Sequence, residues 1–279
     1  MTVLVIGASS QIGWFLLPRL LATGEPVLAM SRHPRPGSPG ITWLHGSLPD
    51  RVPALPSLSA IISCGPLSHL ADWLSQASLG DAPRVIATSS MSAESKRDSP
   101  VPGERDVSRQ LRESEAALAG ACERHGSAWT VLRPTLVYGA GLDQSLAPMA
   151  RRAMRTRLFP LPAGRGLRQP VHADDIAQAA LAALECPASA GRVLPIGGGE
   201  RLAAAEMFAR VRRSLPATTI PVPLPAWLLH AVQLALPRLR GPLGRLDRDL
   251  VADNAELERL LGIRPRPFRP EASMWLPSG

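Results

Sequence analysis

The chain is poor in the residues that carry several kinds of chemistry. Its 279 residues include one lysine and one tyrosine, Lys96 and Tyr138, and aromatic side chains make up only 4% of it. Its three cysteines are too few and too scattered for a disulfide framework or a metal site; they are Cys64, Cys122 and Cys186. We therefore expect reduced thiols, no bound metal and a cytoplasmic protein.

Long hydrophobic runs are also absent. No stretch reaches the roughly 20 consecutive apolar residues that a membrane span requires, so no span is expected. The segment 225–241, "PAWLLHAVQLALPRLRG", could lie on a membrane surface, although a helix within a lobe is favoured. The N-terminus leads straight into "VLVIGA" without a basic head, which argues against a signal peptide.

The charge is unevenly distributed. The formal net charge is +8, and residues 144–173 contain no acidic side chain. The arginines of this stretch are Arg151, Arg152, Arg155, Arg157, Arg165 and Arg168. Nucleic-acid binders usually combine such charge with stacking aromatics, and here only Phe159 is available. A pocket for a phosphorylated small molecule fits better, and a solvated basic face is the alternative.

Short apolar runs alternate with helical patterns in the first half of the chain. The runs typical of buried strands are 3–8, 26–31, 41–46, 58–64, 84–90 and 129–134. Helices are predicted at 12–24, closed by Gly24, and at 108–125. This alternation predicts an α/β fold: a Rossmann-type, doubly wound parallel sheet with a smaller, mostly helical C-terminal lobe.

The alternation becomes less regular after Gly139. The expected elements are helices at 145–156 and 172–185, a Pro/Gly-rich loop at 160–170, a strand at 191–198, and helical stretches near 201–214, 224–236 and 253–261. We predict a dinucleotide-binding domain at 1–139, to which 168–198 returns. A substrate lobe is predicted at 140–279.

The stretch "VIGASSQIG" joins the first predicted strand to the first helix. Gly7, Ser10 and Gly13 occupy its three turn positions. Such a turn exposes backbone N–H groups and the positive end of a helix dipole to a phosphate. Its place between a buried strand and an amphipathic helix predicts dinucleotide binding.

The end of the second predicted strand indicates which dinucleotide is preferred. An NAD-binding fold usually has an acidic residue there to hold the ribose 2′-hydroxyl. This chain has Ser31, Arg32 and Arg35 instead, and an arginine suits a 2′-phosphate. We expect NADP to be preferred, with NAD possible.

Several motifs together resemble a known family. "GASSQIG", "ATSS", "WTVLRPTLVYG" and "RQPVHADDIAQA" are similar to the extended short-chain dehydrogenase/reductases, the NAD-dependent epimerase/dehydratase group. The resemblance covers nearly the whole chain. It implies a Rossmann domain, a bound nicotinamide dinucleotide and often a nucleotide-sugar substrate held by the C-terminal lobe.

The resemblance, with the phosphate turn, gives a set of expected site residues. Those expected to bind the cofactor are Gly7, Ser9, Ser10, Gln11, Ile12, Gly13, Ser31, Arg32, Arg35, Ser47, Leu48, Cys64, Gly65, Thr88, Pro134 and Thr135. An aspartate is usual where Ser47 stands. Ser89 and Arg168 are expected at the substrate, where Arg168 matches an arginine that grips the diphosphate of nucleotide sugars.

The catalytic residues implied by the resemblance are only partly present. The family uses a Ser or Thr at the end of the fifth strand and a Tyr-x-x-x-Lys on the next helix. Ser90 matches the serine, but the tyrosine and lysine positions are occupied by Val107 and Leu111. Because the chain has a single tyrosine and a single lysine, no shift of the alignment restores this pair.

Three interpretations of the missing pair remain open. Lys96 could return to the nicotinamide as a displaced cation or acid, helped by Arg112 or Glu113. Tyr138 could supply the proton from the opposite side. The third interpretation is that nothing replaces the pair and the chain only binds a dinucleotide.

The functional prediction therefore has two forms. The first is an atypical oxidoreductase or epimerase that acts on a phosphorylated, nucleotide-sugar-like substrate, with Ser90, Lys96 and Tyr138 as candidate catalytic residues. The alternative is a catalytically inactive sensor, chaperone or structural protein. A homodimer through the 108–125 helix is plausible, whereas nucleic acid is not expected as a partner.

Overall fold

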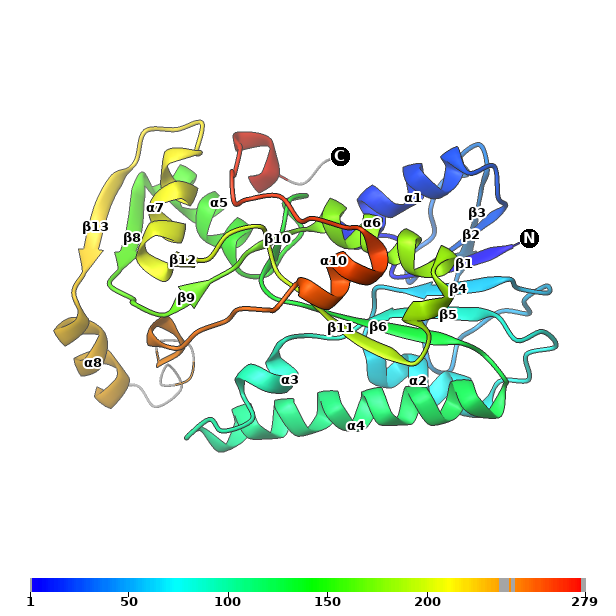
Figure 1. The fold of residues 1–279 in the computed structure, drawn as a ribbon. Coiled ribbons are helices and arrows are strands. Elements are labelled where there is room, and N and C mark those ends of the chain that lie inside the picture. Colours follow the sequence, from blue (N-terminus) through cyan, green and yellow to red (C-terminus); the bar gives the residue numbers. More distant parts are fainter. Residues whose placement is uncertain (1, 236–240, 242–243, 277–279) are drawn as a thin grey trace.

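The computed structural model describes residues 2–235, 241 and 244–276, and its centre is a seven-stranded sheet (Figure 1). The strands are β1 (Val3–Ile6), β2 (Val27–Ser31), β3 (Ile41–His45), β4 (Ala60–Ser63), β5 (Arg84–Thr88), β6 (Trp129–Pro134) and β11 (Arg192–Ile196). Their order is β11-β6-β5-β4-β1-β2-β3, and every pair is parallel. The predicted doubly wound fold is confirmed, and its switch point lies between β1 and β4.

Four helices cover the two faces of the sheet. α1 (Gln11–Ala22) and α6 (Ala173–Glu185) share one buried cluster with the sheet, and α2 (Leu67–Gln76) and α4 (Pro102–Arg124) share the cluster on the other side. α4 begins at Pro102, earlier than the predicted 108, because a proline is well suited to the first turn of a helix. The chain returns to the sheet through α6 and β11, which lies beside β6.

The C-terminal lobe has its own core and extends away from one end of the sheet (Figure 1). Its helices are α5 (Leu146–Thr156), α7 (Ala204–Arg213) and α8 (Ala226–Ala235), whereas α10 (Ala255–Leu261) packs on α6 and β11 of the Rossmann part. Its short strands are β7 (Val137–Tyr138), β8 (Leu158–Pro162), β9 (Leu167–Arg168), β10 (Val171–His172), β12 (Leu202–Ala203) and β13 (Ile220–Leu224). In the described part of the chain, no helix is long and apolar enough to cross a membrane.

The loop predicted at 160–170 is wrong in part. β8 pairs with β13 in parallel, and β9 pairs with β12 in antiparallel fashion. Prolines are tolerated in β8 because each strand of a two-stranded ladder keeps one edge unpaired.

Candidate functional site

A cleft of about 540 Å³ lies at the carboxyl ends of the central strands. The predicted cofactor residues that line it are Gly7, Ser9, Ser10, Ser31, Arg32, Ser47, Leu48, Cys64 and Gly65. The sequence analysis did not select the residues that complete the lining, which are Ile6, Met30, Gly46, Pro66 and His69. His69 lies in the first turn of α2, so a recognised helix after the fourth strand would have pointed to it.

The glycines of the phosphate turn keep this cleft open. Gly7 has a φ of +72°, and a Cβ there would come within 3.0 Å of the Cys64 carbonyl carbon. A Cβ on Gly13 would overlap the backbone of Ala8. The Ser10 hydroxyl caps α1 by accepting a hydrogen bond from Gly13 N at 3.2 Å. The turn therefore forms a cradle that fits a pyrophosphate, with the N-terminus of α1 behind it.

The end of β2 presents a basic side chain without a carboxylate. Ser31 is buried and accepts a hydrogen bond from His33 N at 3.2 Å, whereas Arg32 is exposed at the cleft. Among the described residues that line the cleft, none is acidic. Arg35 does not line it, because its guanidinium lies over the Trp43 ring, 5.6 Å from the centroid. Its expected cofactor contact is not supported.

The remaining predicted cofactor residues also lie outside the lining of this cleft; they are Gln11, Ile12, Gly13, Thr88, Pro134 and Thr135. Gln11 Nε2 donates to Val137 O at 3.4 Å, and Thr88 Oγ1 donates to Ser63 O at 3.4 Å. The Thr135 hydroxyl donates to the Gln169 carbonyl. Thr135 thus ties the end of β6 to the lobe, a role that its sequence position does not reveal.

A second cleft, of about 480 Å³, lies between the Rossmann part and the lobe. Its charged lining residues come from distant parts of the sequence and are Lys96, Glu104, Arg168, Arg245, Arg248 and Asp249. Two of the predicted site residues, Lys96 and Arg168, therefore share one cavity. This convergence depends on long-range packing, which the sequence pattern does not reveal.

Lys96 follows the short helix α3 (Ser92–Ser95) and is half-buried in the second cleft. The pKa of its ammonium is lowered from 10.5, first because burial disfavours the charged form and second because Arg245 is near. Glu104 opposes the shift. Lys96 is therefore a cleft residue rather than a solvated loop charge.

Arg168 is buried, and its guanidinium already donates hydrogen bonds to backbone carbonyls. Its Nη1 donates to Leu167 O at 2.8 Å and to Arg248 O at 2.6 Å, and its Nη2 donates to Arg245 O. These bonds hold the turn η3 (Arg245–Asp247) against β9. The structure thus gives Arg168 a positioning role, while Arg245 and Arg248 offer the more exposed cations of the cleft.

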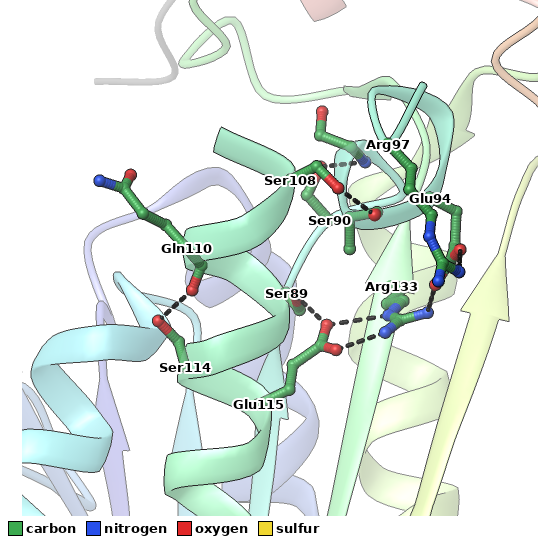
Figure 2. A network of polar contacts seen from close by, with 11 residues as sticks. Ser89, Ser90, Glu94, Arg97, Ser108, Gln110, Ser114, Glu115 and Arg133 are labelled. Carbon is green, nitrogen blue, oxygen red and sulfur yellow. Dashed lines mark hydrogen bonds and ion pairs between the residues drawn. The ribbon is translucent and has the colours of Figure 1, made fainter. Parts of the chain in front are cut away.

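Figure 2 shows a polar network around the end of β5. Ser89 Oγ donates to Glu115 Oε1 at 2.5 Å, and Glu115 is paired with Arg133 through Oε1 at 2.8 Å and through Oε2. Arg133 also donates to Glu94 at 2.8 Å. The Ser89 hydroxyl is consequently committed to α4. The Ser90 hydroxyl accepts a hydrogen bond from Ser92 N at 3.1 Å and donates none among the described residues, and Ser90 lines neither cleft.

The two positions that lack the family's dyad lie on the outer part of α4. Val107 and Leu111 line a groove between α2 and α4, which includes Pro66 of the cofactor cleft. Glu113 also lines this groove and lies 3.8 Å from Arg109. Arg112 is half-buried, and it lines neither cleft.

Tyr138 is buried in the core of the lobe. Its ring packs edge-on against His172 and Phe268, with centroid distances of 5.1 and 4.8 Å. Burial raises the pKa of its phenol above the usual 10.0. Because it lines neither cleft, its position does not support the interpretation of Tyr138 as proton donor.

The chain's similarity to known proteins agrees with this geometry. The model of the NAD dependent epimerase/dehydratase family matches residues 68–197. A UDP-glucose 4-epimerase from Vibrio cholerae is 25% identical over 168 residues, which are 58% of this chain and 49% of that protein. This chain is related to the epimerase/dehydratase family. The resemblance seen in its motifs is confirmed, although the match spans only about half the length of the curated relative.

Solved structures resemble this chain over nearly its full length. MoeE5 in complex with UDP-glucose and NAD is 20% identical with a TM-score of 0.71, and the match covers 96% of this chain and 94% of that one. A UDP-glucose 4-epimerase from Thermotoga maritima with UDP-glucose is 17% identical with a TM-score of 0.70, and the coverages are 99% and 97%. At these identities the likeness establishes the fold.

Proposed function

We propose that the chain binds a nicotinamide dinucleotide in the first cleft and a phosphorylated, nucleotide-sugar-like substrate in the second. The observation that carries the proposal is the glycine cradle, in which the approach of Gly7 to Cys64 leaves no room for a side chain. Binding of NAD and UDP-glucose by MoeE5, a protein of the same fold, supports it. A bound nicotinamide would supply hydride transfer.

The chain's own residues suit distinct tasks in this proposal. Ser9 and Ser10 lie where the turn would receive the pyrophosphate. Ser90 is the proposed hydrogen-bond donor to a reacting oxygen, since its hydroxyl accepts from Ser92 N and donates no hydrogen bond among the described residues, although Ser90 lines neither cleft. Arg245 and Arg248 give the second cleft the positive charge that a substrate phosphate requires.

The preference for NADP rests on Arg32. It is the only basic side chain with a permanent charge among the described residues that line the first cleft, and no carboxylate opposes it there. A guanidinium can bind a 2′-phosphate through two parallel hydrogen bonds.

The test is calorimetric titration of NADPH and NADH into the protein and into Arg32→Ala. Losing a hydrogen bond to a charged group costs about 1.5–3 kcal/mol, so NADPH affinity should fall at least about tenfold while NADH affinity stays unchanged. Arg35→Ala is the matched control, because Arg35 lies on Trp43 outside the cleft. Tighter binding of NADH than NADPH by the wild type would overturn the preference, and binding of neither would overturn the proposed function.

A non-catalytic dinucleotide-binding protein is the second candidate function. The observation that favours it is the combination of Val107 and Leu111 at the dyad positions with a buried Tyr138. A homodimer through α4 and a cytoplasmic location stay predictions in either case.

A further inference from the structure

Lys96 is chemically unusual within this chain. It is one lysine in a total of 31 basic lysine and arginine side chains. Arginine stays protonated in proteins, whereas an amine can lose its proton and attack an electrophile. The one side chain with this capacity lines the second cleft rather than the outer surface.

The ammonium of Lys96 is uncommitted in the part of the chain that the structure describes. It forms no ion pair within 4.0 Å and donates no hydrogen bond there, although Glu104 lines the same cleft. Its half-buried position and the neighbouring Arg245 lower the pKa of the ammonium. These are the conditions under which lysines become nucleophiles.

Two arginines beside Lys96 keep hydrogen-bond donors available. Arg245 Nε lies 3.0 Å from Glu104 Oε1, and Arg248 Nη1 donates to Ser99 Oγ at 3.1 Å. Their Nη2 groups donate no hydrogen bond within the described ranges, and the side chains are 46% and 39% exposed. A phosphate or carboxylate can therefore be held in the cleft that Lys96 lines.

We propose that Lys96 forms an imine with an anionic carbonyl compound, an aldehyde or ketone that carries a phosphate or carboxylate held by Arg245 and Arg248. The lone pair of Nζ attacks the carbonyl carbon, and the carbonyl oxygen takes up protons and leaves as water. The nitrogen gives up its two protons, so amine and carbonyl become imine and water.

This chemistry goes beyond dinucleotide binding and does not depend on it. It needs neither the first cleft nor a redox cofactor. A failure of the NADPH titration would leave the imine untouched, and a failure of the imine would leave the first cleft untouched.

The experiment is trapping with pyridoxal 5′-phosphate and borohydride, followed by peptide mass spectrometry. Since the chain has one lysine, a reduced adduct on an ε-amine can only be on Lys96, and the terminal amine is separated by its own peptide. We expect one adduct per chain on Lys96, formed at least about tenfold faster than on free Nα-acetyllysine at neutral pH. Labelling at the rate of free acetyllysine, or only at the terminal amine, would overturn the proposal.

Matched variants test the two parts of the site. Lys96→Arg keeps the charge and should abolish the adduct. Arg245→Met should slow labelling by pyridoxal 5′-phosphate about tenfold but leave pyridoxal, which has no phosphate, unaffected. Arg97→Met is the control, because Arg97 is exposed and does not line the cleft. Equal effects of Arg245→Met and Arg97→Met would refute the anion site.

Pyruvate with cyanoborohydride distinguishes the two anions. An adduct with pyruvate at a rate comparable to the phosphate probe supports a carboxylate-bearing substrate, and a much slower one supports a phosphate-bearing substrate. An adduct on Lys96 from neither probe would contradict the imine itself.

Discussion

Asp174 joins three segments that are far apart in the sequence. It stands in the first turn of α6 and accepts hydrogen bonds from Arg19 of α1 at 2.7 and 2.9 Å. Arg266, in the C-terminal segment, donates to it at 2.7 Å and to Asp175 at 2.8 Å. The N-cap of α6 is His172, whose Nδ1 accepts from Asp174 N at 3.1 Å. The two aspartates therefore act as ion-pair partners, and neither caps the helix.

The pH dependence of stability should reveal this role of Asp174. Burial alone would raise the pKa of the carboxyl, but the hydrogen bonds from Arg19 and Arg266 outweigh it, so the pKa lies below 3.8. Asp174 therefore stabilises the fold above pH 3.8, and this contribution disappears as the pH falls through the lowered pKa. Asp174→Asn should lower the free energy of unfolding by about 2 kcal/mol at pH 7, measured by urea unfolding.

The same comparison at low pH provides the check. The difference between wild type and Asp174→Asn should shrink as the pH falls below 3.8 and through the lowered pKa, because Asp174 then loses its charge. Asp72→Asn is the control, since Asp72 is exposed and has no ion-pair partner in the described ranges. A difference that stays constant down to pH 2 would show that the effect of the substitution is not electrostatic.

Among the elements, the contact between the strand β9 and the turn η3 depends on Arg168. Leu250 N donates to Leu167 O at 2.8 Å, and Leu167 N donates to Asp249 Oδ1 at 2.7 Å. The guanidinium of Arg168 adds bonds to the carbonyls of Arg245 and Arg248. The position of the two cleft arginines is thus set from β9.

Replacing Arg168 should loosen this turn even without a ligand. Arg168→Met removes hydrogen bonds from a charged donor, so amide exchange in residues 245–250 should accelerate about tenfold or more. Hydrogen-exchange mass spectrometry measures this, with Arg165→Met as the exposed neighbouring control. Unchanged amide exchange together with lost affinity for phosphorylated ligands would instead support direct binding of the substrate phosphate by Arg168.

The strands that the sequence predicted well are those that are buried on both faces. Parallel strands buried on both faces are continuous apolar runs, so β1, β2 and β6 were predicted close to their bounds. The helix α2 was missed although Leu67, Leu70, Ala71 and Leu74 are apolar at helical spacing, and this signal was available.

The short strands of the lobe carry no such local signal. β8 forms by pairing with β13, which lies far along the chain, and its prolines argue for a loop.

The residues of the candidate site also differ in whether a local sequence signal predicts them. The phosphate turn is local and was predicted from its glycines, whereas Lys96 lines one cleft with Arg245 and Arg248 only because the lobe packs against the segment that holds α3 and α4.

At the scale of the whole molecule, the two clefts offer separate sites for a cofactor and a substrate. The cradle at Gly7 suits a dinucleotide, and the second cleft carries the charge for an anionic substrate. The usual acid is missing from α4, where Val107 and Leu111 line neither cleft. If the missing pair is all that separates this chain from an active reductase or epimerase, restoring it should produce turnover.

The double variant Val107→Tyr/Leu111→Lys tests this. The tyrosine would supply a proton and the lysine would lower the pKa of its phenol, so turnover of a nucleotide-sugar panel with NADPH or NAD should rise about 10²–10⁴-fold. Both positions line the groove that meets the first cleft at Pro66. Val107→Phe/Leu111→Met adds similar bulk without an acid and should behave as the wild type. Equal rates in the two double variants would show that α4 does not face the reacting atoms, and no turnover in any of the three proteins would favour the non-catalytic binder.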